Sequence, residues 1–500
     1  MSSVIILGIY LVMMVVVGIY SWKKTKSVND FVLGGRNLGS WLTAFAYGTT
    51  YFSAVVFIGY AGQFGWGYGV SATWIGIGNA IIGSLLAWLV LGRRTRTMTK
   101  HLESATMPDF FEKRYSSKTL KIVSSMIIFI FLVPYTASVY KGLGNLFALA
   151  FDVNINVCLI IMAVITGFYV IMGGYLATAI SDFIQGIIML GGIVMVVLFV
   201  VNGKGGFAEA INQLKAIPVA SGAKGGFGSL FGPDPIGLLG VVVLTSLGTW
   251  GLPQMIHKFY TIKDDKAIKK GAIISTVFAL VISGGSYFMG SFGRLYIKAG
   301  ADGKPINGFD MIVPDMLKGN IPDILMGIVI VLVFSASMST LSALVMTSSS
   351  TFTLDFLKGN LVKKMSLKAQ MLCIRILCAF FVILSVVIAL NPNTLITALM
   401  SLSWGALAGS FLAPFLYGLY WKGVTKTAVW ASFFTGIGIT VSNYVVSLVN
   451  NTPNGFGFLA PPTAGAIAML VSLIVVPTVS ILTKKQDSEK LSEIFACYQK

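Results

Sequence analysis

Long apolar stretches recur along the whole chain and predict helices that cross a membrane. A helix that crosses the hydrocarbon core of a bilayer needs about 20 mainly apolar residues, and thirteen stretches of the sequence are long enough. They lie near residues 3–22, 41–62, 69–92, 121–147, 154–174, 181–202, 236–257, 271–293, 323–353, 371–390, 395–420, 427–448 and 463–483. Most polar segments between them are short. The pattern therefore predicts an all-α integral membrane protein with about 13 transmembrane helices packed as a bundle.

Two of these predicted helices are interrupted by residues that weaken a helix. The second contains Gly48 and a run of small polar residues, and the seventh contains Gly248, Gly251 and Pro253. Proline removes a backbone donor and glycine loosens the turn before it, although a simple proline kink would also explain the seventh helix. An unwound stretch frees carbonyl groups that can bind an ion. Because the two interruptions lie five spans apart, they predict a five-plus-five inverted-repeat core with broken second and seventh helices.

This arrangement divides the chain into six consecutive segments. They are a first transmembrane helix with a cytoplasmic loop (1–40), a first inverted repeat (41–202), an extracellular loop (203–235), a second inverted repeat (236–421), two C-terminal transmembrane helices (422–483) and a cytoplasmic tail (484–500). The tail is polar and short, so no kinase or receptor module is expected.

The composition agrees with a chain that lies mostly in a bilayer. Hydrophobic residues make up 56% of the sequence and charged residues 11%, with a mean hydropathy of +0.84. A typical soluble chain carries roughly 25% charged residues. So much apolar surface also excludes intrinsic disorder. The four cysteines form no CxxC pair and there are only two histidines, which argues against a disulfide scaffold and against a zinc site.

The basic excess follows membrane topology. The formal net charge is +18, and when the predicted loops are numbered alternately, 28 of the 36 lysines and arginines fall on one side. Cytoplasmic loops carry an excess of lysine and arginine. The N-terminus is therefore expected outside and the C-terminus in the cytoplasm, and the positive charge does not indicate a nucleic-acid partner.

One acidic residue, Asp182, differs from the others, nearly all of which lie in loops or at helix ends. It lies at the inner end of the sixth span with apolar sequence on both sides. A carboxylate at that depth is costly and by default marks the path of an ion or a substrate. The alternative is a residue near a helix N-terminus that the helix dipole favours. We favour the first interpretation, because capping alone would not require an ionised group inside the membrane.

The ninth span carries many hydroxyl side chains in its middle. Most of them are explained by bonding to their own backbone and by helix packing. However, Ala336, Ser339 and Thr340 stand at positions i, i+3 and i+4, which places them on one helical face. Two hydroxyl oxygens beside a carbonyl oxygen form a neutral cluster that suits a weakly held hard cation. The spacing therefore predicts a cation site, with the interrupted second helix as its complement.

Several motifs together resemble the sodium:solute symporter family. The likeness runs from about Asp30 to Trp421. It depends on Asp30-Phe31-Val32-Leu33-Gly34-Gly35-Arg36, on Pro108-Asp109-Phe110-Phe111-Glu112-Lys113-Arg114-Tyr115, on Ser181-Asp182 with Gln185, and on Met338-Ser339-Thr340-Leu341-Ser342. The resemblance implies a core of ten helices in two inverted repeats, which here would be the second to eleventh spans, and it implies sodium as the coupling ion.

Carried over by motif, the family's sodium site falls on five residues of this chain. The backbone carbonyls of Thr49, Phe52 and Ala336 and the hydroxyls of Ser339 and Thr340 are the implied ligands. This set includes the helical face that the spacing of the ninth span predicts.

Some relatives hold a second sodium near the aspartate at the inner end of the sixth span. Asp182, Ser339 and Ser342 match that pattern, and Asp182 and Ser342 would act either as second-site ligands or as part of the sodium release path. Ala343 stands where the pattern has a further serine, so the resemblance leaves the number of sodium ions open.

The resemblance also places the solute between the two broken helices near the membrane midplane. The candidate residues are Tyr51, Gln63, Tyr135, Thr245, Thr249, Trp250 and Gln254. Tyr135 matches a pocket tyrosine of proline transporters, but Tyr51 stands where those carriers have an aspartate. Residues 50–53 and 251–253 resemble the pantothenate carriers instead. A small carboxylate such as pantothenate is therefore expected, with proline or another amino acid as the alternative.

The sequence thus predicts a secondary active symporter in the bacterial cytoplasmic membrane that couples inward sodium movement to solute uptake. Proton coupling is the competing form of transport. An enzyme is not expected, because His101 and His257 have no carboxylate or cysteine nearby in the sequence, and no filter signature indicates a channel. The expected partners are a small organic solute and lipid, with neither nucleic acid nor an obligate protein partner.

Overall fold

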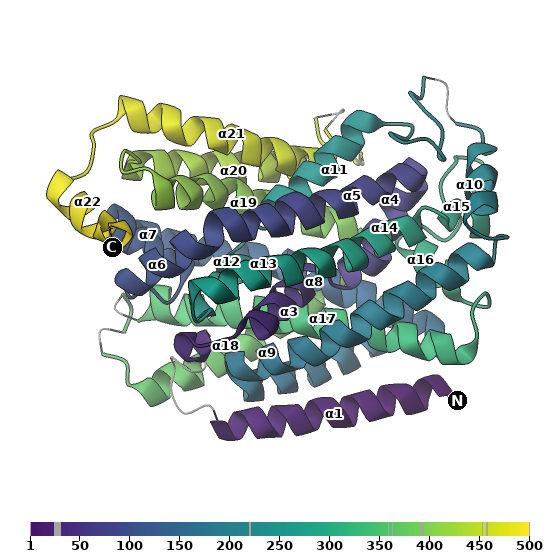
Figure 1. Cartoon of the computed structure of the whole chain (residues 1–500), viewed down its shortest axis with the longest axis horizontal. Helices are drawn as coiled ribbons and strands as arrows, with labels where there is room; N and C mark the ends of the chain where they lie inside the picture. Colours follow the sequence, from purple (N-terminus) through teal and green to yellow (C-terminus); the bar gives the residue numbers. More distant parts are fainter. Residues whose placement is uncertain are drawn as a thin grey trace.

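The computed structural model describes residues 2–24, 32–219, 222–358, 360–362, 364–391, 395–452, 454–456 and 459–499. These residues form a bundle of helices (Figure 1), with four isolated β-bridges between loop residues. Among the described residues, ten helical stretches are long and apolar enough to cross a membrane, and Ser3–Val17 and Ile155–Ile171 are shorter apolar helices. The prediction of an all-α membrane protein is confirmed. Two residues of the first predicted family motif, Asp30 and Phe31, lie outside the described part of the chain.

The bounds of the elements follow the apolar stretches of the sequence. The α-helices are α1 (Ser2–Lys24), α3 (Ser40–Tyr51), α4 (Ala61–Tyr68), α5 (Thr73–Gly78), α6 (Arg93–His101), α7 (Met107–Tyr115), α8 (Lys118–Phe151), α9 (Ile155–Asn202), α10 (Phe207–Lys215), α11 (Pro235–Gly248), α12 (Pro253–Thr261), α13 (Asp265–Ala279), α14 (Gly285–Gly290), α15 (Gly293–Tyr296), α16 (Ile312–Leu317), α17 (Asp323–Thr351), α18 (Leu367–Ala389), α19 (Ile396–Tyr420), α20 (Lys426–Val449), α21 (Pro461–Leu482) and α22 (Ser488–Phe495). The π-helical segments are η2 (Val55–Tyr60), η4 (Asn79–Leu86), η5 (Trp88–Gly92), η6 (Leu280–Gly284) and η8 (Phe352–Leu357), and the 3₁₀ turns are η1 (Gly34–Arg36), η3 (Gly69–Ala72), η7 (Phe309–Met311) and η9 (Ala496–Tyr498).

The number of spanning stretches differs from the thirteen that the sequence predicts. Two of the thirteen correspond to Ser3–Val17 and Ile155–Ile171, which among the described residues count as shorter apolar helices. The third difference arises where the second and third predicted helices meet, because Val55–His101 is helical almost throughout. The chain turns inside this stretch at Gly69, whose φ is +62°. Only glycine adopts that backbone conformation at low cost, and a Cβ there would lie 2.1 Å from the carbonyl oxygen of Phe227.

Both interrupted helices break where glycine and proline weaken them. Helix α3 ends at Tyr51, and Phe52 is extended with φ −112° and ψ 113° before the chain becomes helical again in η2. Helix α11 ends at Gly248, Leu252 is extended with φ −79° and ψ 122°, and α12 begins at Pro253. A proline at the first helical position needs no backbone donor, so it starts α12 cleanly.

Helix α17 lies inside the bundle. It packs against α1, α3, α8, α9 and α18, and Figure 1 shows α3, α8 and α17 between α1 at one edge and α19, α20 and α21 at the other. Its buried residues run without a gap from Val329 to Ser342. A helix that is buried on all sides can present polar groups to several neighbours at once, and this position gives its hydroxyl groups access to α3 and α9.

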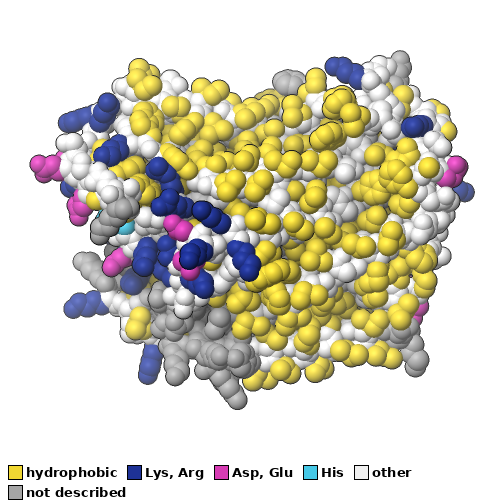
Figure 2. Space-filling model, viewed as in Figure 1, with side chains coloured by type: hydrophobic (Ala, Val, Ile, Leu, Met, Phe, Trp, Pro, Cys, Tyr) yellow, Lys and Arg dark blue, Asp and Glu magenta, His cyan; other side chains and the backbone are white. Residues whose placement is uncertain are grey.

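On the face shown in Figure 2, apolar side chains cover the middle and basic side chains gather at one end. That end is formed by α6, α7 and α22 and is called the basic end below. Helix α6 contributes Arg93, Arg94 and Arg96 to it. A broad apolar area bordered by a charged end is the surface expected of a protein surrounded by lipid.

Candidate functional site

Three backbone carbonyl groups converge on one hydroxyl where the end of α3 meets the middle of α17. The Thr340 Oγ1 lies 3.3 Å from the Thr49 oxygen, 3.2 Å from the Thr50 oxygen and 3.1 Å from the Ala336 oxygen. All four residues are buried. A threonine hydroxyl has a single proton to donate, so it can satisfy only one of the three acceptors at a time. The remaining lone pairs form an electron-rich cluster that suits a cation.

Ser339 joins the same cluster through a chain of two hydroxyl groups, its own and that of Thr49. Its Oγ donates to the Thr49 Oγ1 at 2.8 Å, and the Thr49 Oγ1 in turn donates to the carbonyl oxygen of Phe45 at 2.8 Å. The structure therefore links four of the five predicted sodium residues by hydrogen bonds, and Phe52, the fifth, follows in the extended break of the same helix. The cluster contains only neutral oxygen donors, which hold an alkali cation weakly enough to release it.

The approach of α3 to its neighbours requires a glycine one position before this cluster. A Cβ at Gly48 would lie 2.3 Å from the ring of Phe278. The ring of Phe278 also contacts Phe45 at a centroid distance of 5.3 Å. Gly48 therefore lets α3 lie close to α13, while its low helix propensity helps the helix end a few residues later.

Asp182 is buried in α9 and faces a lysine that the sequence analysis did not identify. The Asp182 Oδ2 lies 3.9 Å from the Lys258 Nζ, and both side chains are 2% exposed. The other carboxylate oxygen, Oδ1, has no hydrogen-bond partner among the described residues. Ser342, which the family pattern pairs with Asp182, donates its hydroxyl to the Met338 oxygen of its own helix at 2.7 Å. The sequence analysis did not single out Lys258, because the sequence of α12 resembles the polar end of a transmembrane span.

A small cavity of about 30 Å³ adjoins this ion pair on the side of the basic end. Its walls come from α9, α12, α17, the start of α7 and Val32. They are formed by Val32, Thr106, Met107, Thr178, Pro253, Gln254, His257, Lys258, Ala343, Met346, Thr347, Ser350 and Thr351. The volume suffices for one or two water molecules. Gln254, one of the predicted solute residues, therefore lies on this cavity, and its Oε1 is buried without a described hydrogen-bond partner.

Four other predicted solute residues meet at a junction of α3, α11 and η4. The Tyr51 hydroxyl donates to the Thr245 oxygen at 2.7 Å. The Thr249 hydroxyl donates to the Gly83 oxygen at 3.0 Å, and the Trp250 indole Nε1 donates to the Ile82 oxygen at 2.9 Å. Because these groups already bond to backbone carbonyls, they stabilise the junction between the two broken helices in this structure.

An aromatic group at the centre of the bundle includes a residue that the sequence analysis missed, Trp404 of α19. Its ring lies 6.1 Å from Tyr51, nearly parallel to it, and 5.8 Å from the predicted residue Tyr135, edge to face. The Trp404 Nε1, the Ser403 Oγ and the Thr50 Oγ1 are buried without a hydrogen-bond partner among the described residues. Buried polar groups normally have partners, so each of these three atoms keeps an unused hydrogen-bonding capacity.

Gln63, the last predicted solute residue, lies apart from this group. Its Oε1 accepts a hydrogen bond from the Thr397 hydroxyl at 2.6 Å, which connects α4 to the start of α19. The structure therefore gathers Tyr51, Tyr135, Thr245, Thr249 and Trp250 near the helix breaks, through direct hydrogen bonds and ring contacts, and places Gln63 and Gln254 elsewhere.

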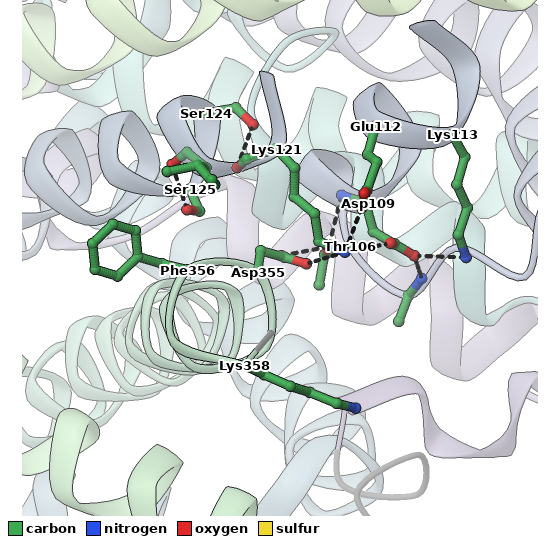
Figure 3. A network of polar contacts seen from close by, with 12 residues as sticks. Thr106, Asp109, Glu112, Lys113, Lys121, Ser124, Ser125, Asp355, Phe356 and Lys358 are labelled. Atoms are coloured by element: carbon green, nitrogen blue, oxygen red, sulfur yellow. Dashed lines mark hydrogen bonds and ion pairs between the residues drawn. The ribbon is translucent and has the colours of Figure 1, made fainter. Parts of the chain in front are cut away.

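Acidic and basic side chains form a partly buried cluster where α7 and α8 meet the end of α17 (Figure 3). The Lys121 Nζ lies 2.8 Å from Asp109, 2.8 Å from Glu112 and 3.7 Å from Asp355. The Thr106 hydroxyl donates to the Asp355 Oδ2 at 2.6 Å. We call these five residues the Lys121 cluster. It ties the motif of residues 108–115 to the helix that carries Ser339 and Thr340.

Replacing Lys121 with methionine should lower the stability of the folded protein. The change leaves three carboxylates without their shared cation, and Asp355 is 2% exposed. Removing one partner of a buried ion pair typically costs about 3 kcal/mol or more. The apparent melting temperature of the detergent-purified protein measures the effect, with Lys100→Met at an exposed position of α6 as the control. Adding Asp355→Asn to Lys121→Met should recover part of the loss; no recovery would contradict the pairing.

Comparison with known proteins identifies the family. A profile of the sodium:solute symporter family matches residues 31–436, more than half of the chain. The chain belongs to the sodium:solute symporter family. This confirms the resemblance that the motifs indicated, and it makes the protein a sodium-coupled solute symporter of the membrane rather than an enzyme.

Two bacterial relatives of this symporter are named as proline transporters. It is 30% identical over 485 residues to the osmoregulated proline transporter OpuE of Bacillus subtilis, an alignment that covers 96% of this chain and 95% of the relative. It is also 30% identical over 504 residues to a sodium/proline symporter of Staphylococcus aureus, with 97% and 93% covered. These relatives favour the amino acid alternative of the sequence analysis over pantothenate.

Solved structures of other transporters share the architecture of the symporter. A sodium-coupled sialic acid symporter in a substrate-bound outward-open state aligns with a TM-score of 0.72 and 17% identity over 97% of this chain and 98% of that one. A transporter of the nucleobase-cation-symport-1 family aligns with a TM-score of 0.50 and 14% identity over 93% and 97%. At these identities the likeness concerns the fold.

Proposed function

We propose that this symporter takes up a small amino acid of the proline type together with sodium. The observation that carries the sodium part is the convergence of the Thr49, Thr50 and Ala336 carbonyl oxygens on the Thr340 hydroxyl. The proposed ligands are the carbonyls of Thr49, Phe52 and Ala336 with the hydroxyls of Ser339 and Thr340. The amino acid part is supported by the named relatives and by the aromatic group around Trp404.

The proposed solute site lies between the helix breaks, beside Tyr51, Tyr135 and Trp404. An indole N–H without a partner is a ready donor for a carboxylate, and a bound carboxylate would also gain from the sodium ion and from the free backbone groups at the helix breaks. Aromatic rings supply apolar area for a compact side chain. A small carboxylate such as pantothenate is the second candidate, because Tyr51 stands where the motif comparison places an aspartate in proline carriers.

The proposed mechanism couples the two ligands through the broken helix α3. Sodium would draw the carbonyls of α3 toward α17 and so order the neighbouring solute site, and linkage requires that the solute tighten sodium binding by the same factor. The cavity beside Lys258 lies between the oxygen cluster around Thr340 and the basic end. It would serve as the start of the sodium release path toward the cytoplasm. Moving one positive charge inward gains about 2.3 kcal/mol per 100 mV of membrane potential.

Uptake into proteoliposomes tests the proposed function. The purified symporter is reconstituted, and uptake of radiolabelled proline and of radiolabelled pantothenate is measured with an inward sodium gradient, with choline in place of sodium, and with a proton gradient alone. Accumulation of proline that requires sodium supports the proposal. Sodium-dependent accumulation of pantothenate alone would replace the solute, and accumulation that needs only the proton gradient would overturn sodium coupling.

Replacing Trp404 with phenylalanine should raise the KM for the transported solute by roughly 10- to 100-fold. The change keeps an aromatic ring but removes the N–H, and a hydrogen bond to a charged group contributes about 1.5–3 kcal/mol. Initial uptake rates at saturating sodium measure the KM. Trp430→Phe, at a half-buried ring of α20, is the control and should leave the KM unchanged; an unchanged KM in Trp404→Phe would place the solute carboxylate elsewhere.

A further inference from the structure

A buried ion pair lies next to the proposed sodium site and belongs to two different helices. Asp182 comes from α9 and Lys258 from α12, the second half of the seventh predicted helix. Their charged atoms are 3.9 Å apart, and each side chain is 2% exposed. Both helices pack against α17, which carries Ser339 and Thr340. The pair therefore lies on the neighbours of the proposed site and does not belong to its ligand set.

A carboxylate buried in a membrane needs a nearby positive charge, because the bilayer and the surrounding apolar groups do not solvate it. A free cation from solution or a basic side chain can supply that charge. Lys258 already does so, since its ammonium lies within ion-pair distance of the carboxylate. A second free cation at the same carboxylate would lie beside this ammonium, and the repulsion between like charges is strong where water is excluded.

One position of the family's second-sodium pattern offers no oxygen in this chain. Ala343 lines the adjoining cavity with a methyl group. The Ser342 hydroxyl donates to the Met338 oxygen at 2.7 Å, and the Ser350 hydroxyl donates to the Met346 oxygen at 2.6 Å. Both serines donate their protons within their own helix, as Thr340 does toward Ala336, and their oxygen lone pairs remain available. The Lys258 ammonium, and not a lack of hydroxyl groups, is therefore what opposes a second cation at Asp182. Sodium needs several oxygen ligands at once, and around Asp182 an ammonium stands where such ligands would have to gather.

We propose that Lys258 is a built-in counter-ion of Asp182 that takes the place of a second sodium, so that the symporter binds one sodium ion per chain. This inference rests on the proposed sodium site. It makes Lys258 the residue that sets the ion stoichiometry. It also explains how a carboxylate can lie at membrane depth next to a neutral sodium cluster: the fixed ion pair carries no net charge, so it leaves the charge of the transported ion unchanged.

Equilibrium binding of sodium alone to the purified symporter tests the inference. The protein is embedded in lipid nanodiscs, and bound ²²Na⁺ per chain is measured against free sodium concentration without any solute. The wild-type protein should bind one sodium ion. Lys258→Gln removes the positive charge and adds a carbonyl oxygen beside Asp182, so this variant should bind two. Lys258→Gln combined with Asp182→Asn removes both charges and should return to one.

Lys263→Gln is the matched control, because Lys263 follows the same helix but is half exposed and pairs with Asp264. It should bind one sodium ion. Two sodium ions bound by the wild type would overturn the inference and leave the proposed function intact, as would one sodium ion bound by a folded Lys258→Gln variant. If Lys258→Gln does not fold, the number of sodium ions bound by the wild-type protein still tests the inference. Absence of any sodium binding would instead overturn the proposed sodium site itself.

Discussion

Alanine at both Ser339 and Thr340 should abolish the stimulation of solute uptake by sodium. The double substitution removes both hydroxyls of the cluster between α3 and α17, and with them the contacts to Thr49 at 2.8 and 3.3 Å. Each lost contact to a cation corresponds to about 1.5–3 kcal/mol. Together they predict a sodium affinity lower by roughly 10²- to 10⁴-fold. Solute uptake into proteoliposomes, measured against external sodium concentration, shows the shift.

Ser337→Ala is the matched control for this experiment. Ser337 is also buried in α17, but its hydroxyl donates to the Val333 oxygen of its own helix at 2.7 Å. It should change uptake little, because such a hydrogen bond within a helix serves local packing. Unchanged sodium stimulation in the Ser339 and Thr340 double variant would remove the proposed site, provided that the variant reaches the membrane in wild-type amounts.

Leucine at Gly290 should prevent the symporter from folding into a stable form. Gly290 ends α14 and faces α4, and a Cβ there would lie 2.0 Å from the Ala61 carbonyl oxygen. A Cβ at Gly65 would likewise lie 2.1 Å from the Gly290 carbonyl carbon. Both neighbours are backbone atoms, so no flexible side chain can move away. Overpacking of this kind costs about 1–3 kcal/mol or more, and two helices would have to separate to accommodate the side chain.

Size-exclusion chromatography of fluorescently tagged protein in detergent measures the outcome for Gly290→Leu. The monodisperse peak should be lost or greatly reduced. Gly191→Leu in α9 is the control, since nothing lies within 4 Å of a Cβ at that position, and it should elute like the wild type. A normal peak and melting temperature for Gly290→Leu would mean that α4 and α14 do not approach each other this closely.

The spans, the helix breaks and the face that carries the cluster follow from local sequence features. Hydropathy predicts the spans because a bilayer imposes one length and one composition on each of them. Gly48 and Pro253 mark the breaks because of their backbone properties. The spacing of Ala336, Ser339 and Thr340 places them on one face of any helix, and the structure then pairs that face with Thr49.

The roles of Trp404 and Lys258 could not be predicted from one sequence. Trp404 and Lys258 carry no local signal: a tryptophan in an apolar span and a lysine near a helix end are ordinary residues. Their importance depends on neighbours from other helices, Tyr51 for Trp404 and Asp182 for Lys258. Gln63 and Gln254 were predicted from the family's pocket position, and the packing of α4 and α12 places them outside the central aromatic group.

By itself, the sequence determined that this protein crosses a membrane many times, that two helices are interrupted, and that one helical face offers neutral oxygen ligands. These properties depend on residues close together in the chain and on the uniform demands of the bilayer. The tertiary structure alone decided which carbonyl groups converge on Thr340, and that a lysine neutralises Asp182. Such pairings depend on how separate helices pack, and helix packing is settled by the whole bundle at once.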